Sequence, residues 1–210
     1  MNNKLTVTIG AFCAFTFSAF AESVRITEEN VAFTYETKAE IATPPKILAG
    51  IISTDYLNAK DEFTAHEMFA KIEPVITKRI EDAKDTKVWR IEITDQLSEY
   101  DFESKLFPTQ LTEGTFIPFV TTTQRYAVKF SNFAAYRNVP VDIEAAKKLS
   151  GSLQKSRQAT ILVEGTVKEA VERKINYSMM KTIIFEISKV TIQLKDGTLV
   201  GEFTPTEVKK

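Results

Sequence analysis

Residues 158–203, QATILVEGTVKEAVERKINYSMMKTIIFEISKVTIQLKDGTLVGEF, decide the fold of this chain. Apolar and polar residues alternate along most of the stretch, which is the pattern of strands with one buried face. Asp196-Gly197 separates the last two alternating runs, and this dipeptide favours a two-residue type I′ turn. We therefore predict a C-terminal β-meander against which the rest of the chain packs.

The turn sets a register for the last hairpin. With Asp196 and Gly197 as the loop, Leu194 faces Leu199 and Val190 faces Phe203. Side chains alternate along a strand, so one face carries Val190, Ile192, Leu194, Leu199 and Phe203. The other face carries Thr191, Gln193, Val200 and Glu202. Upstream, the apolar positions are odd-numbered, so a one-residue change of phase near Ser188-Lys189 predicts a β-bulge.

The first 21 residues have the pattern of a secretory signal. Lys4 makes a basic start, residues 5–20 are apolar or small, and Ala19-Phe20-Ala21 supplies the small residues that a signal peptidase reads. The apolar run is shorter than the ~20 residues that a membrane span needs. We predict export to the periplasm or the medium after cleavage following Ala21, with no stable membrane insertion afterwards.

The composition of residues 22–210 excludes several kinds of protein. Cys13, the single cysteine, leaves with the signal, so no disulfide, thiol nucleophile or thiolate metal site is expected. Without Lys4, 26 of the 27 basic residues remain against 28 acidic ones, a formal net charge of −2. The signs are interspersed, which disfavours nucleic acid and anionic membrane as partners. A chain of this length buries about 70% of its surface on folding, enough for one domain.

Upstream of the meander, the hydrophobic pattern predicts helices and strands in a mixed order. Alternation at residues 31–35 predicts a strand, and Thr43 as N-cap with Pro44 predicts a helix start. The strongest helix spans residues 60–84, with Asn58 or Asp61 as its cap and with Pro74 expected to bend it. Its core-facing stripe is Ala65, Phe69, Ile72, Ile76, Ile80 and Ala83.

Four further strands and one short helix are predicted between residues 88 and 149. The strands span residues 88–93, with Trp89 turned inward, 97–106, 116–122 and 126–130. Pro118 either keeps the third at a sheet edge or breaks it, and the second is expected to pair with the fourth. Asp142 caps a helix that Gly151 ends.

These elements predict an α+β fold. An antiparallel sheet of about five to seven strands, with its C-terminal β-meander, packs against one long kinked helix and one or two short helices. Residues 1–21 form the signal peptide, residues 22–205 a single domain, and residues 206–210 a flexible tail.

The order of several aromatic motifs resembles a family of exported bacterial proteins of unknown function. The motifs are Tyr100-Asp101-Phe102, Phe107-Pro108 and Tyr126-Ala127-Val128-Lys129-Phe130, followed by the helix at Asp142. The family has no assigned activity, so the resemblance implies only an exported, uncharacterised bacterial protein.

Three carboxylates are the best enzymatic candidates. Glu99, Asp101 and Glu103 share one face of the strand predicted at residues 97–106. Glycoside hydrolysis needs two carboxyl groups ~5–9.5 Å apart in different environments. A solvated, lysine- or arginine-paired face explains the same pattern without catalysis.

The remaining chemical motifs are weak. His66 and Glu62 are four residues apart on the predicted helix, but two ligands do not make a metal site, and the second histidine of H-E-x-x-H is absent. Ser-x-x-Lys occurs at Ser152 and at Ser178 without the K-T-G that accompanies it in penicillin-recognising enzymes. No metal and no cofactor are predicted.

Aromatic residues in loops and at strand edges suggest binding instead. Such residues mark contacts more often than cores, and they are Phe107, Phe116, Phe119, Phe133 and Tyr136. The leading hypothesis is a non-catalytic binding or interaction domain for an unknown protein or envelope component, with strand addition at an open sheet edge as one mechanism. The alternative is a hydrolase of cell-wall glycan or polysaccharide that uses Glu99, Asp101 and Glu103.

Overall fold

A computed structural model describes residues 23–109 and 111–204 of the protein. The predicted signal peptide, with Cys13, and the predicted tail at residues 206–210 lie outside the described residues. Within them, no helix is long and apolar enough to cross a bilayer. The elements are β1 (Val24–Arg25), α1 (Val31–Glu36), α2 (Pro45–Ile52), α3 (Thr54–Leu57), α4 (Glu62–Asp85), β2 (Trp89–Gln96), β3 (Leu106–Pro108), β4 (Phe116–Val120), β5 (Arg125–Phe130), η1 (Phe133–Tyr136), β6 (Asn138–Pro140), α5 (Ile143–Lys155), β7 (Gln158–Ile175), β8 (Ser178–Leu194) and β9 (Leu199–Phe203).

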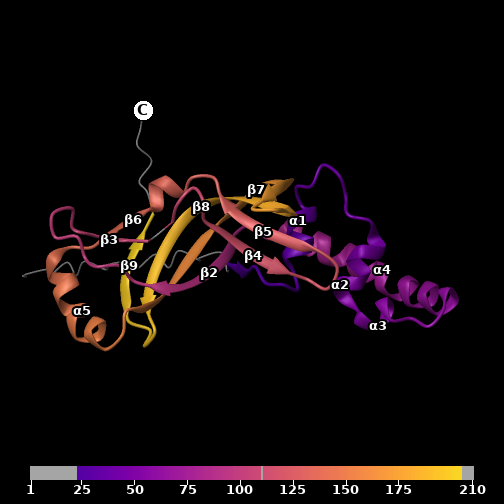
Figure 1. Cartoon of the computed structure of the whole chain (residues 1–210), viewed down its shortest axis with the longest axis horizontal. Helices are drawn as coiled ribbons and strands as arrows, with labels where there is room; N and C mark the ends of the chain where they lie inside the picture. Colours follow the sequence, from indigo (N-terminus) through magenta and orange to yellow (C-terminus); the bar gives the residue numbers. More distant parts are fainter. Residues whose placement is uncertain (1–22, 110, 205–210) are drawn as a thin grey trace, which may run out of the picture.

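A long antiparallel hairpin, β7 and β8, runs through the middle of the molecule (Figure 1). The described strands form a seven-stranded sheet in the order β1-β2-β7-β8-β5-β4, with β9 also beside β8, and a separate β3-β6 pair. In this sheet β1·β2 and β5·β8 are parallel, and the other ladders are antiparallel. The protein is thus α+β with a mostly antiparallel sheet, and the predicted β-meander is confirmed.

A bulge in β8 lies where the sequence predicts it. The pairing passes from Glu164↔Lys189 to Gly165↔Ile187, which leaves Ser188 as an extra residue. The extra residue restores the alternation to the same face, so apolar side chains on both sides of it are buried.

Gly165 fits the close approach of the strands beside this bulge. A Cβ atom at this position would lie 2.0 Å from the carbonyl oxygen of Glu186, so no other residue fits without a backbone shift. A second register shift, between Val167 and Glu169, was not predicted.

The bulge in β8 is also where one strand partner replaces another. β5 pairs with β8 up to Phe185, and β9 pairs with it from Val190 onward. Between them, the side chain of Asn132 takes the place of a strand. Its Nδ2 donates to the carbonyl of Ile187 and its Oδ1 accepts from the N–H of Ile187, both at 2.8 Å. The backbone groups of Ile187 are therefore satisfied in the gap between the two strands.

The turn at Asp196-Gly197 differs from the predicted type. Gly197 has a φ of +85°, whereas Asp196 is not among the described residues with positive φ. The N–H of Gly197 donates to the carbonyl of Leu194 at 2.8 Å. This is a three-residue loop in which a type I turn is followed by a left-handed glycine, so the type I′ prediction is wrong.

That longer turn changes the register of the last hairpin near its tip. Val190 pairs with Phe203 as predicted, but Gln193 pairs with Leu199 after a register shift. Leu199 is therefore 54% exposed and Val200 is 5% exposed, the reverse of the prediction.

The strand predicted at residues 31–35 is wrong, because this segment forms α1. Every residue from Val31 to Tyr35 is buried, at odd and even positions alike. The alternation of apolar and polar residues therefore does not mark a buried and an exposed face here. The side chain of Asn30 accepts from the N–H of Thr27 at 2.8 Å immediately before the helix.

Two predicted helix boundaries are also corrected. α2 begins at Pro45 rather than Pro44. α5 has the predicted cap, with Asp142 accepting from Ala145, but it continues through Gly151. The cost of a helical glycine, about 1 kcal/mol, is offset because Leu153 in the next turn packs on the core.

α4 begins as predicted, with the carboxylate of Asp61 accepting from the N–H of Thr64 at 2.9 Å. Its predicted stripe faces inward, since Ile76 and Ala83 are buried and Phe69, Ile72 and Ile80 pack against the core. α4 lies mainly against α1 and α2 rather than on the sheet, so a group of helices covers this end. The bend at Pro74 stays a prediction.

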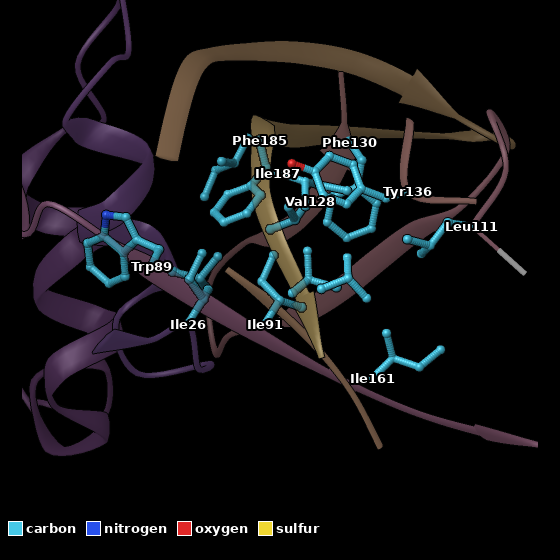
Figure 2. Packing of buried hydrophobic residues seen from close by; sticks show 14 of the residues in the cluster. Ile26, Trp89, Ile91, Leu111, Val128, Phe130, Tyr136, Ile161, Phe185 and Ile187 are labelled. Atoms are coloured by element: carbon cyan, nitrogen blue, oxygen red, sulfur yellow. The ribbon is translucent and has the colours of Figure 1, made fainter. Parts of the chain in front are cut away.

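The core lies between the strands and these helices. Figure 2 shows Val128 and Phe130 of β5 next to Phe185 and Ile187 of β8, and the rings of Phe130 and Phe185 are 6.1 Å apart. Trp89 is buried, as predicted, at the end of the cluster near the helices. α2, α3 and α4 lie at one end of the molecule and α5 at the other (Figure 1).

Replacing Asn132 tests its role between β5 and β9. Asn132→Ala leaves the N–H and C=O of Ile187 without partners, so we expect a loss of about 2–4 kcal/mol in the free energy of unfolding, measured by urea denaturation. Asn132→Asp keeps the acceptor and loses the donor, and is expected to be intermediate. Asn138→Ala, at an exposed residue of β6, serves as the control. Equal stability of Asn132→Ala and the control would contradict this role.

Candidate functional site

The segment after β2 forms a tight turn rather than the strand predicted at residues 97–106. Backbone hydrogen bonds join Asp101 and Leu106 in both directions. The carboxylate of Asp101 accepts from the N–H groups of Glu103 and Ser104, at 2.9 and 3.1 Å, and Lys105 has a φ of +55°. This local side-chain bonding competes with a sheet ladder and wins here. The predicted pairing of this segment with β5 is wrong, because β5 pairs with β4 and β8.

The three candidate carboxylates consequently do not share a strand face. Glu99, Asp101 and Glu103 are all exposed, and none lines the cavities at α5 or α4. The hydrogen bonds from Ser104 and from the N–H of Glu103 lower the pKa of Asp101. A general acid in glycoside hydrolysis needs a raised pKa, so Asp101 is placed to hold the turn.

The turn presents one aromatic ring to solvent. Phe102 is 70% exposed, and its ring meets Tyr100 edge to face at 5.1 Å between centroids. The ring of Tyr100 lies 5.0 Å from Phe107, which is fully buried. The hydroxyl of Tyr100 donates to the carbonyl of Val141 at 2.7 Å. The three rings thus form a fixed series from the surface to the core.

A cavity of about 380 Å³ opens between this turn and α5. Its α5 residues recur every three or four positions, so they lie on one face of the helix. We call it the α5 pocket; it is lined by Tyr100, Phe102, Phe107, Ile143, Ala146, Lys147, Ser150, Leu153, Gln154 and Arg157. The volume falls in the range of small-molecule sites, and most of the lining is apolar.

Arg157 is held firmly at one end of the α5 pocket. Its Nε donates to the carbonyl of Leu97 at 2.8 Å, and a terminal guanidinium nitrogen donates to the carbonyl of Ser98. The N–H of Leu97 in turn donates to the carbonyl of Arg157 at 2.7 Å. These bonds join the end of α5 to the segment that carries the aromatic rings.

The five predicted binding residues do not form one surface. Phe107 and Tyr136 are buried, so neither ring belongs to an exposed surface. Phe116, Phe119 and Phe133 are partly buried. Among the described ring contacts, none joins two of the five. Of this set, Phe107 lines the α5 pocket.

Phe102 was not among the predicted binding residues because the sequence predicts a strand at residues 97–106, in which Phe102 lies on the face opposite Glu99, Asp101 and Glu103. The available signal was Asp101, whose side chain favours a turn when short polar residues such as Ser104 follow. Leu153 and Gln154 lie beyond the helix end predicted at Gly151, and no local pattern indicates that the earlier turns of α5 lie beside the turn at Asp101.

β4 lies at the sheet edge, as predicted from Pro118. Pro118 pairs with Ala127 of β5 and has no N–H to donate. An incoming strand would therefore find one donor fewer on this edge, which weakens strand addition here.

His66 lies on the exposed side of α4, beside an open cavity of about 550 Å³. The lining includes Glu62, the partner four residues away, together with the rings of Tyr56, Phe63 and Phe69. Within the described residues, no group of three histidine, cysteine, aspartate or glutamate side chains could hold a metal. His66 and Glu62 are thus two possible metal ligands without a third beside them in the part of the chain that the structure describes.

A polar cluster is enclosed between α1, the segment after it and the sheet. Lys181 of β8 donates to Thr43 at 2.8 Å and lies 4.7 Å from the ring centre of Tyr35. Glu36 accepts from the N–H of Thr43 at 3.0 Å and from its hydroxyl. These contacts fasten the N-terminal segment to β8.

Tyr126, opposite Lys181 on β5, completes this cluster. Its hydroxyl is buried without a hydrogen-bond partner. Burial chiefly, and then the charges of Glu36 and of the Tyr35 phenol group, raise the pKa of Tyr126. A perturbed pKa beside a lysine can mark catalysis, but Tyr126 is 0% exposed. With no surface to offer a substrate, its role is in packing.

The fold and the α5 pocket define an α+β domain with a ligand-sized apolar cavity at one end of a mostly antiparallel sheet. Residues 50–150 match the family described as "Domain of unknown function (DUF4852)". The match covers slightly less than half of the 210 residues and includes the aromatic wall of the pocket and the first half of α5. It confirms the resemblance to a family of unknown function. Comparisons with curated proteins and with solved structures found no significant match.

Asp101→Ala tests the turn that presents Phe102. Loss of the carboxylate removes the acceptor for two N–H groups, so the amides of Glu103 and Ser104 should exchange with solvent at least severalfold faster, measured by NMR. Asp101→Asn keeps an oxygen acceptor and should change the rates less. Glu99→Ala removes an exposed carboxylate nearby and should leave them unchanged. Unaltered exchange in Asp101→Ala would show that the turn does not depend on this side chain.

Tyr126→Phe removes a buried hydroxyl that has no partner. We expect the free energy of unfolding at pH 8 to stay equal or rise by about 1 kcal/mol, measured by urea denaturation. Tyr100→Phe, which loses a hydrogen bond to Val141, should instead destabilise. A clear loss of stability in Tyr126→Phe would contradict the unpaired state of the hydroxyl.

The pH dependence of the same variant gives a second readout. The pKa of Tyr126 is raised in the folded state, so the unfolded chain loses its phenolic proton first. The free energy of unfolding is therefore unaffected by this group below the unfolded pKa of about 10 and falls as pH rises above it. The wild type should therefore lose more stability between pH 9 and pH 11 than Tyr126→Phe.

Proposed function

We propose that this protein is a non-catalytic binding domain whose α5 pocket holds a small apolar ligand. The observation that carries the proposal is the exposure of Phe102 beside that pocket. The tight turn holds a large apolar ring in water, and this ring contributes favourable free energy when a ligand covers it. Exposed aromatic residues beside pockets are typical of binding sites.

The surrounding structure supports binding to a preformed site. Asp101 fixes the turn through two hydrogen bonds, and Arg157 fixes its other end to α5. Side chains that are already ordered lose little entropy when a ligand arrives, which favours affinity. The ligand thus meets the rings of Phe102 and Tyr100 in the positions that it needs.

The proposal includes export. The N-terminal 21 residues have the composition of a secretory signal, and the ligand would then be a molecule of the periplasm or the medium. An envelope component or the apolar side chain of a partner protein presents similar chemistry to this pocket.

A neutral fluorescent probe, N-phenyl-1-naphthylamine, tests the site. We expect the full domain to bind it with increased fluorescence, and Phe102→Ala to weaken binding about tenfold, which corresponds to about 1.4 kcal/mol. Phe63→Ala is the matched control, because Phe63 is also a largely exposed phenylalanine, at 85% against 70% for Phe102, and lies beside a cavity at α4.

The two variants separate the two cavities. Loss of binding in Phe63→Ala with none in Phe102→Ala would place the probe at α4 and overturn the proposal. Both residues are largely exposed, so we expect each variant to keep the fold. Circular dichroism of both variants checks this.

A further inference from the structure

We infer that the ligand of the α5 pocket is an amphiphile with one anionic head group, bound with its apolar body against the aromatic rings and its head at Arg157. This inference rests on the proposed function and adds the chemical class of the ligand. It follows from the unequal distribution of polar groups and charges along the pocket.

Most polar residues of the lining come from the later part of α5 and from Arg157 after its end, with the apolar Leu153 among them. The aromatic wall of Tyr100, Phe102 and Phe107 lies with Ile143 of the first turn of α5. Later turns of the same helix face contribute Ser150 and Gln154, and Arg157 follows directly after the helix. A ligand that fills the whole pocket therefore needs an apolar part and a polar part.

Arg157 gives the polar end a positive charge that is not neutralised. A guanidinium has five N–H donors, and the described bonds use two of them toward the carbonyls of Leu97 and Ser98. Within the described residues, no carboxylate lies within ion-pair distance of Arg157, and the pocket lining contains no acidic residue. The remaining donors can bind an oxyanion.

Lys147 adds a second, weaker charge to the lining. It pairs with Glu144 at 2.7 Å, and both side chains are mostly exposed. Exposed pairs of this kind contribute little and open easily. Lys147 can therefore turn toward an anion in the pocket, but Arg157 is the fixed cation.

Acidic residues at the aromatic end set the direction of binding. Asp101 directly follows Tyr100 in the chain, and Asp142 follows Val141, whose carbonyl accepts from the Tyr100 hydroxyl at 2.7 Å. Burial first, and then the charges of these two carboxylates, raise the pKa of Tyr100. An anionic head is repelled there and attracted at Arg157. The carbonyl end of α5 opposes an anion with roughly half a charge, less than the full charge of Arg157.

A matched pair of probes tests the inference. Binding of 2-naphthoate and of neutral 2-naphthamide to the full domain is measured by isothermal titration calorimetry, at low and high salt. We expect naphthoate to bind about tenfold more tightly at low salt, with this advantage reduced by 500 mM NaCl because charge attraction is screened. Phe102→Ala should weaken both probes.

Three charge variants locate the head group. Arg157→Gln should remove the preference for naphthoate while binding of naphthamide persists, which also shows that the pocket stays intact. Lys147→Gln should reduce the preference less. Lys148→Gln, the neighbouring exposed lysine outside the pocket lining, should leave it unchanged.

The outcomes separate this inference from the proposed function. Binding of naphthamide that depends on Phe102, with no preference for naphthoate, overturns the anionic ligand and leaves the pocket as a binding site. An equal loss of both probes in Arg157→Gln, at unchanged thermal stability, also overturns it. If neither probe binds in a way that depends on Phe102, the proposed function fails as well.

Discussion

The long β7–β8 hairpin is the constraint on which the rest of the structure depends. The edge of β7 that faces away from β8 pairs with β2. The edge of β8 that faces away from β7 is divided between β5 and β9. The division is possible because Ser188 bulges between the two partners and Asn132 satisfies the backbone of Ile187 in the gap. A continuous ladder would exclude one of these partners. The bulge thus lets one strand organise both ends of the sheet.

A cationic side chain fastens each end of the molecule, but the two attachments differ in what they cover. At the helical end, the contacts of Lys181 with Thr43 and Tyr35 fasten the N-terminal segment to β8, and α1 is buried on all sides. At the other end, hydrogen bonds from Arg157 tie α5 to the segment after β2. The first attachment encloses its polar groups, whereas the second leaves an apolar cavity open to solvent. That difference is why the proposed site lies at α5 and the perturbed Tyr126 is assigned to packing.

The α5 pocket shows how a polar turn positions an apolar contact. The carboxylate oxygens of Asp101 accept backbone N–H groups, and the same bonds hold the turn on which Phe102 is exposed. Asp101 therefore supports the residue to which we assign binding in the proposed function. An aspartate looks the same in the sequence whether it lies on a strand face or in a turn. Its hydrogen-bond partners decide whether its carboxylate faces solvent or holds the backbone of a turn.

The sequence by itself determined the elements in which one local pattern dominates. The period-two alternation of the meander, the change of phase at Ser188, the cap of α4 at Asp61 and the edge position of Pro118 follow from short-range chemistry, and each is present. Only the tertiary structure decided the rest. α1 is buried on every side, which makes its alternation uninformative, and Phe102 lines a cavity because a helix distant in the sequence lies beside its turn. The pocket joins residues about 50 positions apart in the chain, and no local pattern encodes contacts at that separation.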